Sequence, residues 1–364
     1  MSVQVSYKKQ FIFAIILLFS FLIIIEIGAR MYDYFEPYCG LKNEKIIYSD
    51  IDYVTKSQIC ESWLSLIWYW DEKTDTYTLE PNQHKSTVNI NSHGLRGEEF
   101  SAEKPDGEYR IFLVGGSTTA SLRAISDDHT PAGYLERKIG EKYPTKNIEV
   151  INAGIPGFTS TQEKKLIENK IVNLEPDLII IYDGTNDVNL PYGFIPHKGS
   201  LRDVLSDVIN RYLPFWETVP VIYHFITQST QEIEKQVFDN SDIELKASTW
   251  ANNHKSVCEL GKIQGYETII LLQPILGTGE RDLTQWEQKQ FEYFDQSKVI
   301  SAYELFAEKL NNLDKNCMMT NDLRNIMDNV KGDVYFDNAH IGYQNNEIVA
   351  EKIFKLIKPI IEYN

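Results

Sequence analysis

Short apolar runs recur along the chain from residue 109 onward, and each of them stops at turn-forming residues. Runs that are apolar at almost every position are typical of strands buried on both faces, as in a parallel sheet. Four such runs end at Gly115-Gly116, at Asn152, at Gly184 and at Pro274. We expect the four strands at residues 110–114, 147–151, 177–182 and 267–272, and a fifth at residues 298–302.

Helix-like stretches separate these runs, notably residues 131–143 and 161–174, and an amphipathic stretch lies at residues 343–361. Strands that alternate with helices predict an α/β fold with a doubly wound, flavodoxin-like parallel sheet of about five strands. We place this domain at residues 106–364. Residues 190–250 interrupt the alternation and read as helical, which predicts a helical insertion that caps a site or meets a partner.

The first 30 residues follow a different pattern. Residues 11–25 contain no charged residue and a single polar one, Ser20. With the next four residues they span roughly 28 Å as a helix, close to the thickness of a bilayer core. Lys8 and Lys9 precede the stretch, so we expect residues 1–30 to form a single-pass membrane anchor with a cytoplasmic N-terminus. The alternative is a cleaved signal peptide, although residues 28–30 match a cleavage site poorly.

Residues 31–105 form an irregular lead-in segment, which we expect outside the cytoplasm with the domain that follows. The segment holds an aromatic cluster at residues 63–70, including Trp63, Trp68 and Trp70. Such a cluster can bind sugar rings or rest at a membrane interface. It more often packs against the main domain, and we favour that interpretation.

Composition narrows the class of partner. The chain has 364 residues, of which 43% are hydrophobic and 24% charged, as is ordinary for a globular chain with a core. Its formal net charge of −16 argues against a nucleic-acid partner, because binding phosphate requires a basic face.

The four cysteines bear on the compartment and on metal binding. An even number in an exported chain permits two disulfides, and we expect Cys39–Cys60 and Cys258–Cys317. The alternative is four unpaired thiols. No C-x-x-C pair is present, and no other His or Cys spacing suggests a metal site, so we expect neither metal nor cofactor.

Candidate chemistry lies at the ends of the predicted strands, where ligands bind in open α/β sheets. Ser117 follows Gly115-Gly116 and is a candidate nucleophile. Gly154 and Asn186 follow the second and third strands, where a backbone N–H and a side-chain amide can meet an oxyanion. Asp337 and His340 precede the last helix, at a spacing that lets a carboxylate orient an imidazole base. Each signal alone also fits a cap, a turn or a surface pair.

Together, these motifs resemble the SGNH hydrolase superfamily, also called GDSL-like esterases, and in particular its membrane-anchored members with a GGST motif. The nucleophile block is similar to residues 115–118, with Gly116 in place of the name-giving Asp. The glycine block matches residues 152–154, the G-x-N-D block residues 184–187, and the D-x-x-H block residues 337–340. Residues 93–97 look like the lead-in of anchored bacterial and archaeal members.

The resemblance implies a mechanism. Ser117 attacks an ester carbonyl while His340 removes its proton and Asp337 orients the imidazole. The N–H groups of Ser117 and Gly154 and the side chain of Asn186 form the oxyanion hole. An acyl-enzyme forms and water hydrolyses it, without a metal or cofactor.

The expected substrates are small O-acyl esters, above all acetyl esters, on small molecules or extracellular glycans. The residues near Ser117 are polar, which favours short acyl groups. An apolar face in the insertion (Leu201, Val204, Leu205, Val208 and Ile209) would favour longer ones if it covered the site. Two other functions stay open: an O-acyltransferase of cell-surface polysaccharide, and a non-catalytic glycan-binding or assembly protein with a degenerate site.

Overall fold

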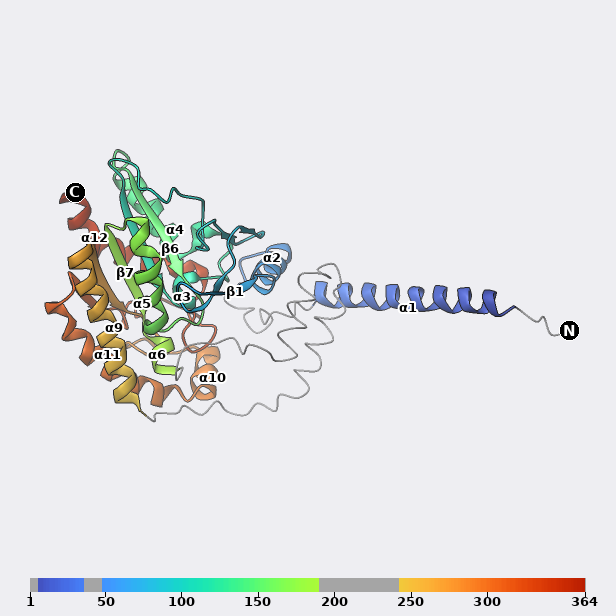
Figure 1. Cartoon of the computed structure of the whole chain (residues 1–364). Coiled ribbons are helices and arrows are strands. Elements are labelled where there is room, and N and C mark those ends of the chain that lie inside the picture. Colours follow the sequence, from blue (N-terminus) through green and yellow to red (C-terminus); the bar gives the residue numbers. More distant parts are fainter. Residues whose placement is uncertain (1–5, 36–47, 190–241, 364) are drawn as a thin grey trace. The chain divides into compact units, whose positions relative to one another are not determined.

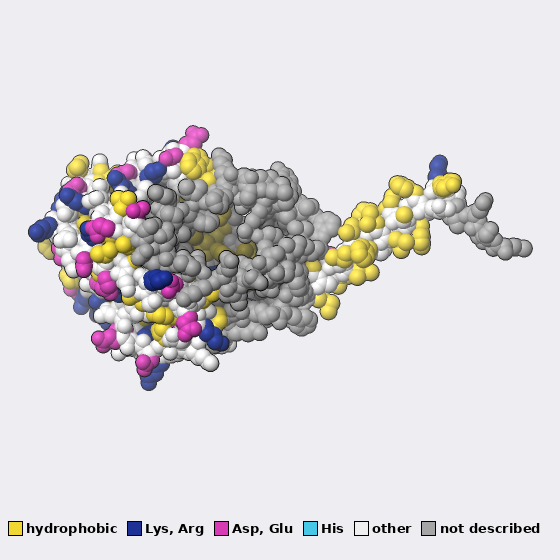
Figure 2. All heavy atoms as spheres, turned by 90° about the horizontal axis from the view of Figure 1, so that it is seen from below, with side chains coloured by type: hydrophobic (Ala, Val, Ile, Leu, Met, Phe, Trp, Pro, Cys, Tyr) yellow, Lys and Arg dark blue, Asp and Glu magenta, His cyan; other side chains and the backbone are white. Residues whose placement is uncertain are grey.

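The computed structural model describes residues 6–35, 48–189 and 242–363, and the chain divides into two compact units (Figure 1). The first unit contains helix α1 (Tyr7–Phe35). Hydrophobic side chains run along this helix (Figure 2), and Tyr7–Met31 contains a strongly apolar window of 18 residues. The helix is therefore long and apolar enough to cross a membrane, a criterion that a signal sequence also meets.

The second unit is built on a five-stranded parallel sheet with the order β6-β5-β7-β8-β9 (Figure 1). The predicted α/β doubly wound class is confirmed. The first strand of the sheet lies between the second and the third, so the strand order reverses beside β5, where ligands bind at the carboxyl ends. The strands are β5 (Tyr109–Gly115), β6 (Ile148–Gly154), β7 (Leu178–Asp183), β8 (Glu267–Leu272) and β9 (Met319–Asp322).

Helices cover both faces of the sheet because successive side chains of a buried strand point to opposite faces. Ile111 and Leu113 of β5 pack with helices α4 (Pro131–Lys142) and α12 (Asn346–Tyr363). Phe112 and Val114 point to the other face, which is covered by α5 (Ser160–Asn169), α9 (Ile243–Gln264) and α11 (Gln296–Asn311).

Two predictions about elements need correction. Residues 298–302 were expected to be the fifth strand, but they lie in helix α11, and the fifth strand is β9. The helical insertion was predicted at residues 190–250. Residues 243–250, however, form the start of α9, which precedes β8 in the sequence and packs on one face of the sheet. The rest of that prediction, including the apolar face from Leu201 to Ile209, lies outside the described residues.

The lead-in segment from residue 48 packs into the same core as the sheet. Leu66, Leu79, Ile90 and Leu95 are buried in the cluster that contains Phe112 of β5. The segment contains α2 (Tyr53–Leu64), the antiparallel pair β1 (Trp68–Asp71) and β2 (Thr76–Leu79), and the antiparallel pair β3 (Gln83–His84) and β4 (Asn89–Ile90). The remaining helices are α3 (Ser117–Ala120), α6 (Thr185–Asn189) and α10 (Gln285–Tyr293), with 3₁₀ turns at Asp127–His129, Ile171–Leu174, Leu313–Lys315 and Tyr343–Asn345.

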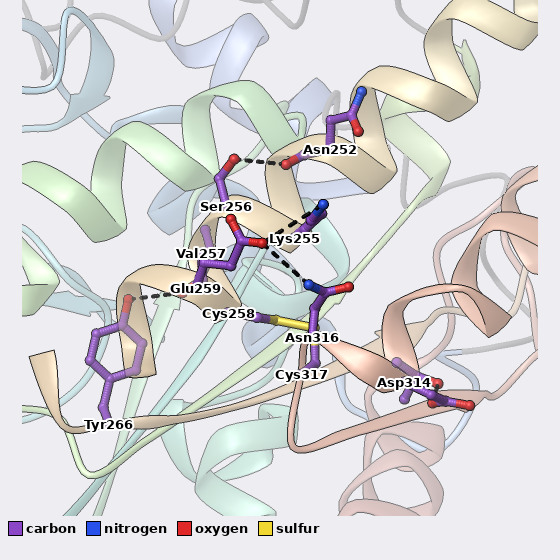
Figure 3. The surroundings of a disulfide bond; sticks show 11 residues. Asn252, Lys255, Ser256, Val257, Cys258, Glu259, Tyr266, Asp314, Asn316 and Cys317 are labelled. Carbon is purple, nitrogen blue, oxygen red and sulfur yellow. Dashed lines mark hydrogen bonds and ion pairs between the residues drawn. A yellow bond between two sulfur atoms is a disulfide. The ribbon is translucent and has the colours of Figure 1, made fainter. Parts of the chain in front are cut away.

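A disulfide joins Cys258 of α9 to Cys317, just before β9, and confirms one predicted pair (Figure 3). The two residues are separated by 59 positions in the sequence. Asn316, beside this bridge, donates to Glu259 of α9 at 3.2 Å. Cys60 is also disulfide-bonded, whereas its expected partner, Cys39, lies outside the described residues.

Candidate active site

Ser117, His340 and Asp337 lie together at the carboxyl end of β5. Ser117 is the first residue of α3, and its Oγ is 2.7 Å from Nε2 of His340. Nδ1 of the same imidazole is 2.7 Å from Oδ2 of Asp337. Serine, imidazole and carboxylate therefore form a continuous hydrogen-bonded chain, which is the arrangement that activates a serine nucleophile.

Asp337 holds both the ring and the backbone of His340. Its Oδ1 accepts the N–H groups of Ala339 at 2.9 Å and of His340 at 2.8 Å, while Oδ2 faces the imidazole. Burial opposes ionisation of this carboxyl, but the nearby imidazole and these hydrogen bonds outweigh it and lower the pKa of Asp337 to about 2. The group is therefore a carboxylate at neutral pH and can accept a hydrogen bond from Nδ1 of His340.

The two glycines before Ser117 are required by close packing. A Cβ at Gly115 would lie 2.3 Å from the carbonyl oxygen of Tyr182, and one at Gly116 would lie 2.5 Å from Nδ2 of Asn186. Real Cβ atoms do not approach other atoms this closely, so a larger residue would displace the backbone at Gly115 and the Asn186 amide at Gly116. The missing side chain of Gly116 thus brings the Asn186 amide next to the nucleophile.

The side-chain amide of Asn186 forms one hydrogen bond with a neighbouring loop. Its Nδ2 donates one hydrogen bond to the carbonyl of Phe158 at 2.7 Å. An amide nitrogen carries two hydrogens, so one donor is left for another acceptor. The bond to Phe158 orients this second hydrogen.

Gly154 does not offer the free N–H that the sequence predicted. Its N–H donates to Oδ1 of Asn152 at 3.0 Å. A Cβ at Gly154 would lie 2.2 Å from the backbone nitrogen of Ala120, so this position must be glycine for packing against α3. The expectation that Gly154 contributes an oxyanion donor therefore needs correction.

Gly157, three residues after Gly154, fits the role of a backbone oxyanion donor better. Residues 155–158 form a turn in which the N–H of Phe158 donates to the carbonyl of Ile155 at 3.1 Å, with Pro156 second and Gly157 third at φ +80°. These are the features of a type II turn, in which the central peptide faces out of the plane of the turn. Pro156 lines the cavity beside Ser117, and the N–H of Gly157 has no acceptor among the described residues. In the sequence, the Pro156-Gly157 dipeptide is the pattern that indicates such a turn.

A cavity of about 180 Å³ opens beside the triad. The lead-in segment contributes Tyr48 and Trp63 to its wall, so part of the predicted aromatic cluster reaches the site while Trp68 packs on the core. The other lining residues are Ser117, Thr118, Ser121, Leu122, Arg123, Pro156, Phe336, His340, Ile341, Tyr343 and Asn346.

Stacked side chains connect the cavity wall with the imidazole of His340. The guanidinium of Arg123 lies over the ring of Trp63 at 4.9 Å and over the ring of Phe336 at 4.8 Å. Phe336 in turn stacks on His340, with ring centroids 5.6 Å apart and planes 5° from parallel. The face of the imidazole is thus packed, which restricts its rotation away from Ser117.

A buried polar network lies behind Asn186. Glu163, Asp183 and His254 each place one ligand atom within 4.8 Å of the others, close enough to hold a metal ion. Asp183 already receives the indole N–H of Trp250 at 3.1 Å and lies 3.2 Å from Nε2 of His254. Burial, and then the charge of Asp183, raises the pKa of Glu163 well above its usual value. A neutral Glu163 can donate its proton to Asp183, so these side chains can satisfy one another without a cation.

A comparison with protein families finds a match over part of the chain. The family model for GDSL-like Lipase/Acylhydrolase matches residues 113–256. This stretch includes Ser117, Gly157 and Asn186 and ends before Asp337 and His340, which the fold brings back to Ser117. The comparison with curated proteins finds no match.

Solved structures with detectable similarity are distant. TesA is 13% identical, with 69% of this chain and 98% of that chain covered and a TM-score of 0.42. An acetyl xylan esterase, AlAXEase, is 16% identical, with coverage of 68% and 99% and a TM-score of 0.40. The acetylxylan esterase Axe2 from Geobacillus stearothermophilus is 16% identical, with coverage of 68% and 94% and a TM-score of 0.41.

The match of residues 113–256 to the GDSL-like lipase and acylhydrolase family, together with the five-stranded parallel fold, supports an esterase of this type. Enzymes of this class act on acylated substrates.

Proposed function

We propose that this protein removes short O-acyl groups from extracellular glycans through an acyl-enzyme on Ser117. The observation that carries the proposal is the hydrogen-bonded chain from Ser117 through His340 to Asp337. His340 takes the hydroxyl proton as Oγ attacks the ester carbonyl, and then gives it to the leaving alcohol. Water repeats the sequence, which releases the carboxylic acid and restores Ser117.

The oxyanion of each tetrahedral intermediate would be met by three donors. These are the backbone N–H groups of Ser117 and Gly157 and the second amide hydrogen of Asn186. Two observations support this set. A Cβ at Gly116 would contact both Nδ2 of Asn186 and the carbonyl oxygen of Phe158, and Pro156 lines the cavity together with Ser117. Gly157 replaces Gly154 in the proposal for the reason given above.

Two features support a short acyl group on a glycan. The cavity of about 180 Å³ has small polar groups beside the nucleophile, from Thr118, Ser121 and Asn346. The partly exposed ring of Trp63 lines the same cavity, and an aromatic face of this kind can pack against the apolar face of a sugar ring.

Two independent observations support the proposal that the catalytic domain lies outside the cytoplasm. Lys8 and Lys9 precede the apolar part of α1, which favours a cytoplasmic N-terminus and a domain on the far side of the membrane. The Cys258–Cys317 disulfide favours an oxidising compartment for that domain. An enzyme in this location would meet extracellular glycans.

Ser117→Ala tests the nucleophile. We expect hydrolysis of an activated acetate ester to fall by about 10⁴- to 10⁶-fold, because a methyl group cannot attack, and labelling by a fluorophosphonate probe to disappear. Ser301→Ala is the matched control, since that exposed hydroxyl on α11 bonds only within its own helix. Turnover or labelling near the wild-type level in Ser117→Ala would refute the assignment.

A series of esters tests the acyl group. Each buried CH₂ contributes about 0.8 kcal/mol, so a site built for long chains gains steeply with length. We expect kcat/KM to be highest for acetyl and propionyl esters and to fall by the octanoyl ester. A steady rise from two to ten carbons would instead indicate lipid or thioester substrates.

A further inference from the structure

The helical turn that carries Ser117 cannot be stable by itself. Helix α3 has four residues, and its two backbone bonds run from Ala120 N–H to Gly116 and from Ser121 N–H to Ser117. Forming a single turn fixes several dihedral angles for very few hydrogen bonds, so it is unfavourable without outside contacts. The turn ends at Ser121, whose φ of +49° is uncommon for a residue with a side chain.

Arg96 of the lead-in segment binds the carbonyl end of this turn. Its Nη1 donates to the carbonyl of Ala120 at 2.9 Å and to that of Ser121 at 2.6 Å. Helices leave their last carbonyls without partners, and a positive charge there is favourable. A third carbonyl, that of Thr119, is taken by the Asn152 side chain at 3.0 Å. The end of α3 is thus held by two segments far away in the sequence.

The guanidinium is itself fully fixed. The Arg96 side chain has no solvent exposure, its Nη2 donates to the carbonyl of Thr87 at 2.9 Å, and its Nε donates to Oδ1 of Asp127 at 2.7 Å. Asp127 also accepts the side-chain amide of Asn89 at 2.8 Å. Burying a charged group is costly unless it is paired. Here the three guanidinium nitrogens of Arg96 donate to four acceptors: the carboxylate of Asp127 and three backbone carbonyls.

We propose that Arg96 is a positioning residue for the esterase reaction, one that holds the turn of Ser117 in its reactive place. The inference rests on the proposed role of Ser117 as the nucleophile. Arg96 does not touch the substrate cavity through its charged group, so its effect reaches the reaction through the carbonyls of Ala120 and Ser121. A lysine cannot replace it, because one ammonium group cannot reach acceptors on all these sides.

The test compares Arg96→Lys with Arg110→Lys. Arg110 is also fully buried, pairs with Glu108 at 2.7 Å and donates to the carbonyl of Leu174 at 2.8 Å. It stands at the amino end of β5, whereas Ser117 follows the carboxyl end, so it shares the burial of Arg96 without contacting α3. Both substitutions should lower the melting temperature.

The readout is the reaction of a fluorophosphonate with Ser117, separated into the fraction labelled at completion and the rate constant of labelling. For Arg96→Lys we expect a rate constant and a kcat about 10- to 100-fold below wild type, with KM within about threefold and the labelled fraction unchanged, because a misplaced nucleophile still reacts but slowly. For Arg110→Lys we expect the wild-type rate constant. Asp127→Asn is a milder second variant, expected to slow labelling in the same direction by a smaller factor.

The outcomes separate the two proposals. A wild-type rate constant in Arg96→Lys and Asp127→Asn, a loss of labelled fraction alone, or an equal slowing in Arg110→Lys would overturn the positioning role. A wild-type protein whose Ser117 is not labelled at all would instead overturn the proposed function.

Discussion

The side chains around Ser117 are held in place by hydrogen bonds and stacking with neighbouring residues. His340 is held by Asp337 and stacked by Phe336, and Asn186 is oriented by the carbonyl of Phe158. Preorganised donors are effective because they do not have to reorient when charge develops in the transition state. The proposed contribution of Asn186 can therefore be measured by removing its amide.

Asn186→Ala should lower kcat by about 10²- to 10³-fold with a smaller effect on KM, because the oxyanion loses a donor that acts in the transition state. Asn189→Ala is the matched control. Asn189 lies in the same short helix, and its amide donates to the carbonyl of Thr185 at 2.9 Å. Steady-state kinetics on an activated acetate ester would measure both. Equal losses in the two variants would point to damage of α6 rather than to loss of a donor.

Sequence motifs located the residues of the proposed site better than they separated roles within it. Ser117 and Asn186 follow strand ends, whereas Asp337 and His340 precede the last helix, and the structure brings His340 within 2.7 Å of Ser117. Two glycines after β6 were harder to tell apart. Gly154 is required by contact with Ala120, and Gly157 by its positive φ. Both constraints select glycine, and they become distinguishable only when neighbouring atoms are known.

At the scale of elements, burial explains which strands were predictable. Residues 178–183 of β7 are buried at every position, so their apolar run is unmistakable. Strand β9 is at the edge of the sheet and reads Met-Thr-Asn-Asp, with no fully buried residue and hence no apolar run. Helix α11 contains a short apolar run at residues 299–300, but its buried residues recur with helical spacing at Val299, Ala302, Tyr303, Phe306 and Leu310.

The disulfide between α9 and the start of β9 should contribute substantially to stability. In the chain-entropy description, closing a loop of 59 residues disfavours the unfolded state by about 4 kcal/mol. The double variant Cys258→Ser, Cys317→Ser should therefore lose a few kcal/mol of unfolding free energy while retaining its fold at low temperature. Denaturant titration of both proteins without reductant would measure it. An unchanged midpoint would contradict the prediction.

At the scale of the whole molecule, the lead-in segment from residue 48 belongs to the same compact unit as the sheet. It provides Tyr48 and Trp63 to the cavity wall and Arg96 to the turn of Ser117. The sequence did not reveal this, because the segment is irregular and its contacts run to residues far away. A fragment that begins at residue 106 would lack all three side chains.

Buried acids should make the stability of this unit depend on pH. Burial, and then the charge of Asp183, raises the pKa of Asp187 to about 7, whereas an unfolded aspartate titrates near pH 3.9. Between these values the folded state holds a proton that the unfolded state has lost, so the unfolding free energy should fall as pH rises through this window. The lowered pKa of Asp337 affects stability only at more acidic pH. The contribution of its carboxylate to the unfolding free energy is lost as the pH falls towards 2.

Asp187→Asn tests this effect, because an amide cannot titrate. We expect a smaller decrease in unfolding free energy from pH 5 to pH 7 than in wild type, measured by denaturant titration at each pH. Asp106→Asn, at an exposed position just before β5, is the control and should leave the slope unchanged. The same slope in wild type and Asp187→Asn would show that this side chain does not couple folding to pH.

The proposed topology concerns the chain as a whole. A reporter fused after Asn364 should be active only outside the cytoplasm, and the protein should stay with membranes after an alkaline carbonate wash, because an apolar helix of this length is held by the bilayer core. Release by carbonate would favour a cleaved signal peptide. Cytoplasmic reporter activity would overturn the orientation.

The wide separation of Ser117 and His340 along the chain has a consequence for biosynthesis. The two residues are 223 positions apart, and the ribosome makes the nucleophile long before its base. A nascent chain that has not yet reached His340 contains Ser117 in an unactivated state, and so does any fragment cut before that residue. Under the proposed mechanism, the esterase is therefore latent throughout most of its synthesis and gains the ability to form an acyl-enzyme only when its last elements have folded onto the sheet.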